Sequence, residues 1–254
     1  MGCTISNKSD KSSEELLIES VENTLQFTQI NSQLLIDSIS LMYPGPQITF
    51  KQLKSSLKCL GLYTSESRGF FAHITMKAPI SMKKIFCLYI LKGKSKLNQK
   101  IRFLFKIYAE SELRIILKSE AELLVSHILQ ITLTSIPSFC TVLYPDESAF
   151  QIYSSKVCLF ANSLLKYFIM KIMKTRLEIS YSELIKCFNV DEELSLLLKG
   201  SKLRDFCVNV FGKQIKNHNN LGSPKHLKGK SSGKFVDEKG VEDSLEQEVC
   251  LSIT

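Results

Sequence analysis

Apolar residues recur at every third or fourth position along most of the chain, which is the spacing of one face of an α-helix. The segments Tyr43-Pro44-Gly45-Pro46 and Ala78-Pro79 interrupt this pattern, and helices are expected to end there. The spacing therefore predicts an all-α protein. Its expected helices cover residues 13–40, 50–60, 70–77, 82–92, 98–108, 157–173 and 203–211.

Short segments centred on an isoleucine separate pairs of these helices. Each isoleucine is expected to lie in a very short strand that pairs with the strand of its neighbour. Their spacing is irregular, which excludes a solenoid repeat and favours paired helix–loop–helix units. The segments are Ile48-Thr49-Phe50, Ile80-Ser81-Met82, Ile116-Leu117-Lys118 and Ile179-Ser180-Tyr181.

Residues 123–144 form an apolar stretch that lacks Asp, Glu, Lys and Arg and is long enough to span a membrane. The stretch also contains several Ser and Thr residues, His127 and Pro137. Because unpaired polar groups are costly in lipid, it is interpreted as two buried segments joined by a turn.

The chain begins Met1-Gly2-Cys3-Thr4-Ile5-Ser6, which fits the signal for N-myristoylation of Gly2. A single myristoyl chain binds membranes only marginally, so stable anchoring needs a second signal. Cys3 is a candidate palmitoylation site that could supply it. Residues 1–13 are therefore expected to be a flexible leader that carries covalent myristate and, on Cys3, palmitate.

The 254 residues include 33 Lys and Arg against 25 Asp and Glu, a formal net charge of +8. This excess favours an acidic partner, which could be nucleic acid, anionic lipid or an acidic protein. Residues 213–234 are rich in Lys and residues 237–248 are acidic, so 213–254 is expected to be a disordered tail.

The acylation signal favours an anionic membrane surface over nucleic acid as the partner of the basic residues, and places the protein on the cytoplasmic face of a membrane. The lysines expected to face that membrane are Lys8, Lys94, Lys96, Lys100, Lys225, Lys228 and Lys230.

Other chemistry has little support in the sequence. The eight Cys residues include no C-x-x-C pair, which argues against a zinc site and a disulfide framework. No phosphate-binding loop, nucleophile elbow, H-E-x-x-H or dinucleotide motif is present, so the protein is not expected to be an enzyme.

The segment from Lys92-Gly93 to Tyr108 resembles the start of the third hand of calcineurin-B-like and neuronal-calcium-sensor EF-hand proteins. The shared pattern is K-G, a few polar residues, then K-[LI]-R-F-x-F-x-[IL]-Y. The resemblance implies EF-hand-like units in two lobes, 14–97 and 98–212, and a regulatory role. The layout is also similar to the region that precedes the TLDc domain in myristoylated TLDc proteins.

A calcium loop needs oxygen ligands at positions 1, 3, 5, 9 and 12 and Gly at position 6. Aligned on the isoleucines at position 8, the loops cover 41–52, 73–84, 109–120 and 172–183. Loop 109–120 offers only Ser111 and Glu120 as side-chain ligands and has Arg114 at position 6; loop 172–183 has Lys174 and Arg176 at ligand positions. No cofactor is therefore expected, and calcium is least implausible at Ser111 and Glu120.

The favoured hypothesis is a lipid-anchored EF-hand-like regulatory or adaptor protein that binds a partner protein or amphipathic helix at a membrane. The alternatives are a genuine calcium sensor of the same type and a basic nucleic-acid-binding helical protein. A groove for a partner helix would be lined by Phe103, Phe105, Leu124, Ile128, Leu164, Phe168 and Phe188, unless these residues simply fill the core.

Overall fold

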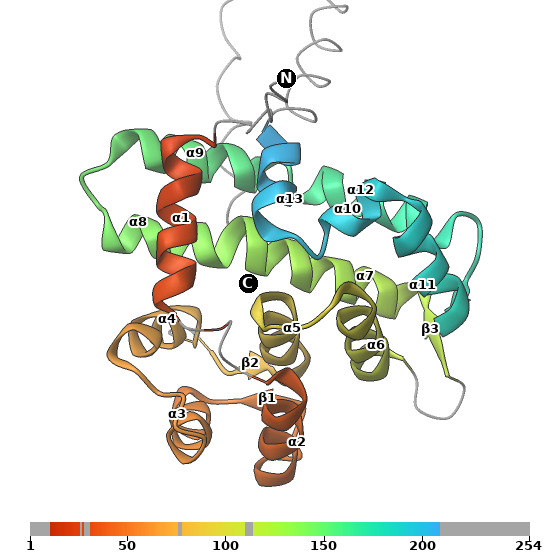
Figure 1. Ribbon diagram of the computed structural model, residues 1–254, viewed down its shortest axis with the longest axis horizontal. Helices are drawn as coiled ribbons and strands as arrows, with labels where there is room; N and C mark the ends of the chain where they lie inside the picture. Colours follow the sequence, from red (N-terminus) through yellow and green to blue (C-terminus); the bar gives the residue numbers. More distant parts are fainter. Residues whose placement is uncertain (1–10, 26, 28–30, 76–77, 110–113, 209–254) are drawn as a thin grey trace, which may run out of the picture.

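A computed structural model describes residues 11–25, 27, 31–75, 78–109 and 114–208. The fold is mostly helical and contains short antiparallel pairings of two strands, as the apolar spacing predicted (Figure 1). The leader residues 1–10 and the tail beyond 208 lie outside the described residues.

The first half consists of two helix–strand–helix units. Their strands pair antiparallel, and the outer helices α2 and α5 pack together, as do the inner helices α3 and α4. The first unit comprises α2 (Ser32–Met42), β1 (Gln47–Ile48) and α3 (Phe50–Cys59), and the second comprises α4 (Ser65–Thr75), β2 (Ile80–Ser81) and α5 (Met82–Lys92).

The second half repeats this arrangement. Strands β3 and β4 pair antiparallel, α6 packs against α11, and α7 packs against α10. The third unit comprises α6 (Leu97–Tyr108), β3 (Ile115–Leu117) and α7 (Lys118–Leu129), and the fourth comprises α10 (Ala161–Met173), β4 (Glu178–Ser180) and α11 (Tyr181–Val190).

A long helical run separates the third unit from the fourth. Helix α7 continues through a π-helical segment, η2 (Gln130–Ser135), into α8 (Ile136–Leu143), so the turn expected within 123–144 is wrong. Pro137 directly follows the π-helical segment, and the helical run continues through it. Helix α9 (Ser148–Leu159) then returns along the run.

The run Lys118–Leu143 has 26 residues and, by length and composition, could cross a membrane. In its most apolar window 67% is buried inside the protein. Such burial is what the central helix of a folded domain shows, and helices α1, α9 and α10 pack along this run.

Two other predicted helices are divided in the structure. The helix expected over 13–40 is α1 (Ser13–Thr24) followed by α2, because the Asn31 side chain accepts hydrogen bonds from the N–H groups of Gln33 and Leu34 and starts a new helix. The helix expected over 157–173 is interrupted at Phe160, where α9 ends and α10 begins. No glycine or proline marks this break; α9 packs on α8 and η2, whereas α10 packs on α7.

The C-terminal part of the described chain folds back over the centre. Helix α12 (Glu192–Leu196) packs on α10 and α11, and α13 (Gly200–Phe206) packs on η2. In Figure 1, α1 lies toward the left of the molecule and α13 near its middle, both next to α9. The predicted last helix, 203–211, thus begins earlier than expected.

One cluster of buried side chains runs through both halves. It includes six of the seven residues proposed to line a partner groove, and Phe103 packs partly buried against it. These residues therefore fill the core in this structure, which is the alternative that the sequence left open for them.

Candidate functional site

The four loops meet in pairs through their isoleucines. Ile48 lies directly opposite Ile80, and Ile116 lies opposite Ile179, in antiparallel register. All four side chains are buried. The prediction that each isoleucine pairs with that of the neighbouring unit is confirmed.

Loop 109–120 has the length of a calcium loop, since α6 ends at Tyr108, eight residues before Ile116. Arg114 has a φ of 53°, the left-handed conformation that favours glycine, at the position where a calcium loop carries glycine. The Glu120 carboxylate accepts a hydrogen bond of 3.1 Å from the N–H of Leu117 and so caps its own helix. Ser111 lies outside the described residues.

In loop 172–183, a cation of the protein itself pairs with the carboxylate at the last loop position. Helix α10 extends to Met173, six residues before Ile179, which leaves a shorter loop than 109–120. The guanidinium of Arg176 forms an ion pair with Glu183. Hydrogen bonds from the N–H and hydroxyl of Ser180, together with the charge of Arg176, hold the pKa of Glu183 below its usual value.

The loops of the first half offer no better ligands. His73 and Thr75 lie within α4, where His73 Nε2 is 3.2 Å from Ser138 Oγ and the Thr75 hydroxyl donates to the Phe71 carbonyl. The Gln52 side chain caps α3 by accepting a 2.9 Å hydrogen bond from the Thr49 N–H. Among the residues that the structure describes, no group of three or more His, Cys, Asp and Glu side chains could hold a metal ion.

The candidate membrane-facing lysines divide into three sets. Lys94 and Lys96 are exposed between α5 and α6. Lys100 is only half-exposed, and its ammonium donates to the Leu91 carbonyl. Burial and the charge of Lys92 lower the pKa of Lys100 to about 8. The acylation residues Gly2 and Cys3 lie outside the described residues, as do Lys8, Lys225, Lys228 and Lys230.

An apolar pocket of about 440 Å³ opens between α7–η2 and α9–α10. Its walls carry hydroxyl, amide and thiol groups but no charged side chain. The lining includes Leu129, Leu133, Cys158, Leu159, Asn162 and Leu165. Its chemistry suits an apolar ligand group and offers neither an acid–base pair nor a metal site.

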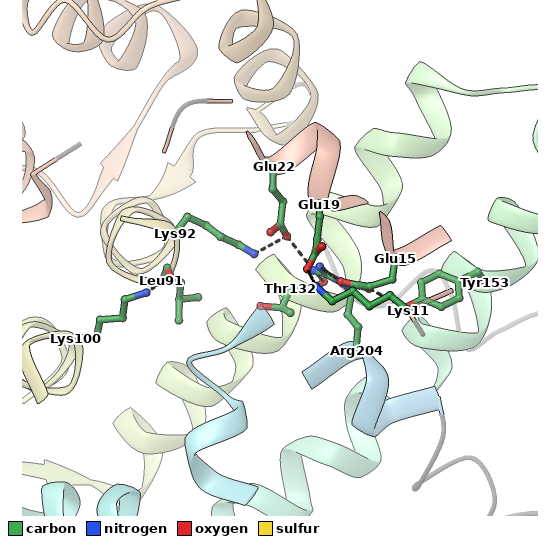
Figure 2. A network of polar contacts seen from close by, with 10 residues as sticks. All are labelled: Lys11, Glu15, Glu19, Glu22, Leu91, Lys92, Lys100, Thr132, Tyr153 and Arg204. Atoms are coloured by element: carbon green, nitrogen blue, oxygen red, sulfur yellow. Dashed lines mark hydrogen bonds and ion pairs between the residues drawn. The ribbon is translucent and has the colours of Figure 1, made fainter. Parts of the chain in front are cut away.

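A buried network of charges ties the two ends of the described chain together (Figure 2). Arg204 of α13 has no exposed surface, and its Nε and Nη2 donate to the Glu15 carboxylate of α1 at 2.8 and 2.6 Å. Its Nη1 donates to Glu22 at 2.9 Å, and the ammonium of Lys92 from α5 pairs with the same Glu22 oxygen at 2.5 Å. The hydroxyl of Tyr153 on α9 donates to Glu15.

The network balances two carboxylates with two cations. Burial alone would raise the pKa of Glu22, but the charges and hydrogen bonds of Lys92 and Arg204 hold it below its usual value. Burial lowers the pKa of Lys92, and Glu22 opposes that shift. Because each charge has a partner, the site is stable when intact and costly to break.

Sequence reasoning missed this network, although a signal was present. Glu15, Ile18, Glu22 and Leu25 follow helical spacing, and Ile18 and Leu25 are buried. Carboxylates on the apolar face of a helix need a cation from elsewhere in the fold. The sequence offers no means of choosing Arg204 as that cation among the 33 Lys and Arg.

No protein-family model matches the chain, and no curated protein matches it.

Proposed function

We propose that this protein is a lipid-anchored, EF-hand-like regulatory or adaptor protein that binds a partner protein at an anionic membrane surface, with little or no calcium binding. The observation that carries the proposal is the direct pairing of loop isoleucines in two pairs of helix–strand–helix units. The acylation signal at Gly2 and the adjacent Cys3 support the membrane anchor.

The side chains of the loops support the absence of tight calcium binding. A hard dication needs several anionic oxygen ligands to offset its dehydration. Arg176 already pairs with Glu183, and Glu120 already caps its own helix. Calcium would have to displace these contacts without gaining a set of carboxylates.

Membrane partition tests the anchor. The full chain, expressed in cells that acylate it, is compared with Gly2→Ala by membrane fractionation. We expect the variant to move largely to the soluble fraction, because it cannot receive myristate and Cys3 alone is a weak anchor. Cys3→Ala separates the two signals and should give a partial shift. Unchanged membrane association of Gly2→Ala would refute the anchor.

Calcium titration by calorimetry tests the loops in the same protein. We expect no micromolar binding. Loop 109–120 has the length and the left-handed residue of a calcium loop, so the sensor alternative predicts binding there and its loss in Glu120→Gln. Micromolar binding abolished by Glu120→Gln would replace the adaptor hypothesis with the sensor.

A further inference from the structure

Helices α9 and α10 form a segment of the chain with only positive charges. Residues 148–177 contain Lys156, Lys166, Lys171, Lys174 and Arg176 and no Asp or Glu. Lys171 pairs with Asp191 and Glu193 of the following segment, and Arg176 pairs with Glu183. Lys156, Lys166 and Lys174 are exposed to solvent.

Large apolar side chains lie exposed between these lysines. Ile152 is 55% exposed and Leu159 is 65% exposed, and together with Lys156 they follow the spacing of one face of α9. On α10, Met170 is 68% exposed and lies one turn from Lys166. We call Ile152, Lys156, Leu159, Lys166 and Met170 the α9–α10 face.

Both ends of the described chain pack against α9, on the buried side of that helix. The Tyr153 hydroxyl of α9 contacts Glu15 near the start of α1, and the Cys207 thiol just after α13 donates to the Val157 carbonyl at 3.6 Å. Figure 1 likewise shows α1, α9 and α13 close together. The chain from Gly2 to Ser12 can span at most roughly 35 Å, so an acyl chain on Gly2 would hold the start of α1, and α9 beside it, within about that distance of the bilayer.

We infer that the α9–α10 face is the surface that contacts the membrane, and that its ligand is an anionic phospholipid bilayer. The apolar side chains would enter the headgroup region while the lysines approach lipid phosphates. The inference rests on the proposed membrane anchor and adds to it the orientation of the protein. It places the contact on α9 and α10 rather than on Lys94 and Lys96.

The first test measures binding of the full acylated chain to vesicles of phosphatidylcholine with phosphatidylserine by flotation. Ile152→Ser with Leu159→Ser should weaken binding on the order of tenfold, because two inserted apolar side chains are lost. Lys156→Glu with Lys166→Glu should weaken it further on the anionic vesicles and have little effect on vesicles of phosphatidylcholine alone.

A matched control is available on α2. Leu34 and Leu41 are 62% and 87% exposed and have the same seven-residue spacing, and α2 lies at the opposite end of the molecule from α9 (Figure 1). Leu34→Ser with Leu41→Ser should leave vesicle binding unchanged. Equal losses in both pairs of variants would overturn the inference.

A second measurement does not depend on loss of binding. The chain contains no Trp, so Leu159→Trp and Leu41→Trp each introduce a single fluorescent probe. Emission from the Leu159→Trp variant should shift to the blue on anionic vesicles, and emission from the Leu41→Trp variant should not.

The two sets of variants also separate this inference from the anchor on which it rests. If Gly2→Ala abolishes binding but the face variants bind like wild type, the anchor stands and this inference fails. If both the face variants and Gly2→Ala bind like wild type, the proposed anchor and this inference both fail.

Discussion

At the scale of single residues, the charges inside the protein have the largest energetic consequences. Arg204 reaches the Glu15 and Glu22 carboxylates from one side chain, and neither Arg204 nor Glu15 has exposed surface. A charge buried without a partner is far more costly than the intact pair is favourable. The network therefore determines how much any change at the chain ends destabilises the fold.

Replacing Arg204 should be severely destabilising. We expect Arg204→Ala to lower the free energy of unfolding by about 3–5 kcal/mol, since Glu15 keeps its burial and loses its cation. Urea unfolding followed by circular dichroism measures the change. The control is Arg176→Ala, whose ion pair with Glu183 is nearly half exposed and is worth less than about 1 kcal/mol. Equal effects of the two substitutions would contradict the role of burial.

At the scale of elements, the loops of the four units share the same kind of strand pairing but differ in backbone conformation. Arg114 is left-handed in loop 109–120, whereas in loop 172–183 the residue with a positive φ is Lys174, at the end of α10. Lys174 has a φ of 53° and a ψ of −114°, a conformation that residues with a Cβ rarely adopt. The helix end therefore stores strain that glycine would relieve.

Replacing lysine by glycine should change the free energy of unfolding in opposite directions at Lys174, at the end of α10, and at Lys166, within α10. We expect Lys174→Gly to raise the free energy of unfolding by about 1 kcal/mol through relief of that backbone strain. Lys166→Gly, on the exposed helix interior, should lower it by about 1 kcal/mol. Thermal unfolding of both variants measures the difference. Destabilisation by Lys174→Gly would show that the residue is unstrained in solution.

The sequence predicted the elements best where local signals were strong. Asn31 and Phe160 show its limits: capping by Asn31 and packing of α9 and α10 on different partners divided two helices whose apolar spacing was continuous. At Pro137 the error was the opposite one: a break was predicted, but the helix continues from the preceding π-helical segment into α8. The isoleucine pairing was predictable since apolar residues in short loops have few other places to be buried.

The site was less predictable than the fold. The loop alignment placed Arg114 where a calcium loop needs a left-handed backbone, and the structure shows that backbone there. The partner of Glu15 is 189 positions away, and single-sequence reasoning does not supply such a contact. The same is true of the lysine set, because Lys100 turns inward to the Leu91 carbonyl.

At the scale of the whole molecule, a buried polar cluster joins the two halves. His127 of α7 lies with its Nδ1 2.6 Å from the hydroxyl of Tyr108 on α6, and that hydroxyl is 3.3 Å from the Lys83 carbonyl on α5. Burial, with the charges of Lys84 and Lys83, lowers the pKa of His127 to about 4 from 6.5. The junction between the halves is therefore built around a neutral imidazole.

Acid should weaken this junction in a defined window. The unfolded chain takes up a proton on His127 below about pH 6.5 and the folded protein only near pH 4, so stability falls as the pH drops through this interval. The loss from this group is on the order of 3 kcal/mol and stops below pH 4.

The variant His127→Gln does not titrate and should show a flatter stability profile between pH 6.5 and about 4 in urea unfolding. Carboxylates such as Glu22, whose pKa is depressed, add acid sensitivity in both proteins, so the difference isolates His127. Parallel profiles for the two proteins would exclude His127 as a source of the pH dependence.

The contact between Glu15 and Arg204 also has a consequence for synthesis on the ribosome. The two residues are 189 positions apart, so α1 emerges long before the cation that neutralises its buried carboxylate. A nascent chain that has not yet released α13 must keep the Glu15 end of α1 hydrated or bound to a chaperone. Closure of the fold thus waits for almost the whole described chain, and a chain that stops before Arg204 leaves the Glu15 carboxylate without its cation.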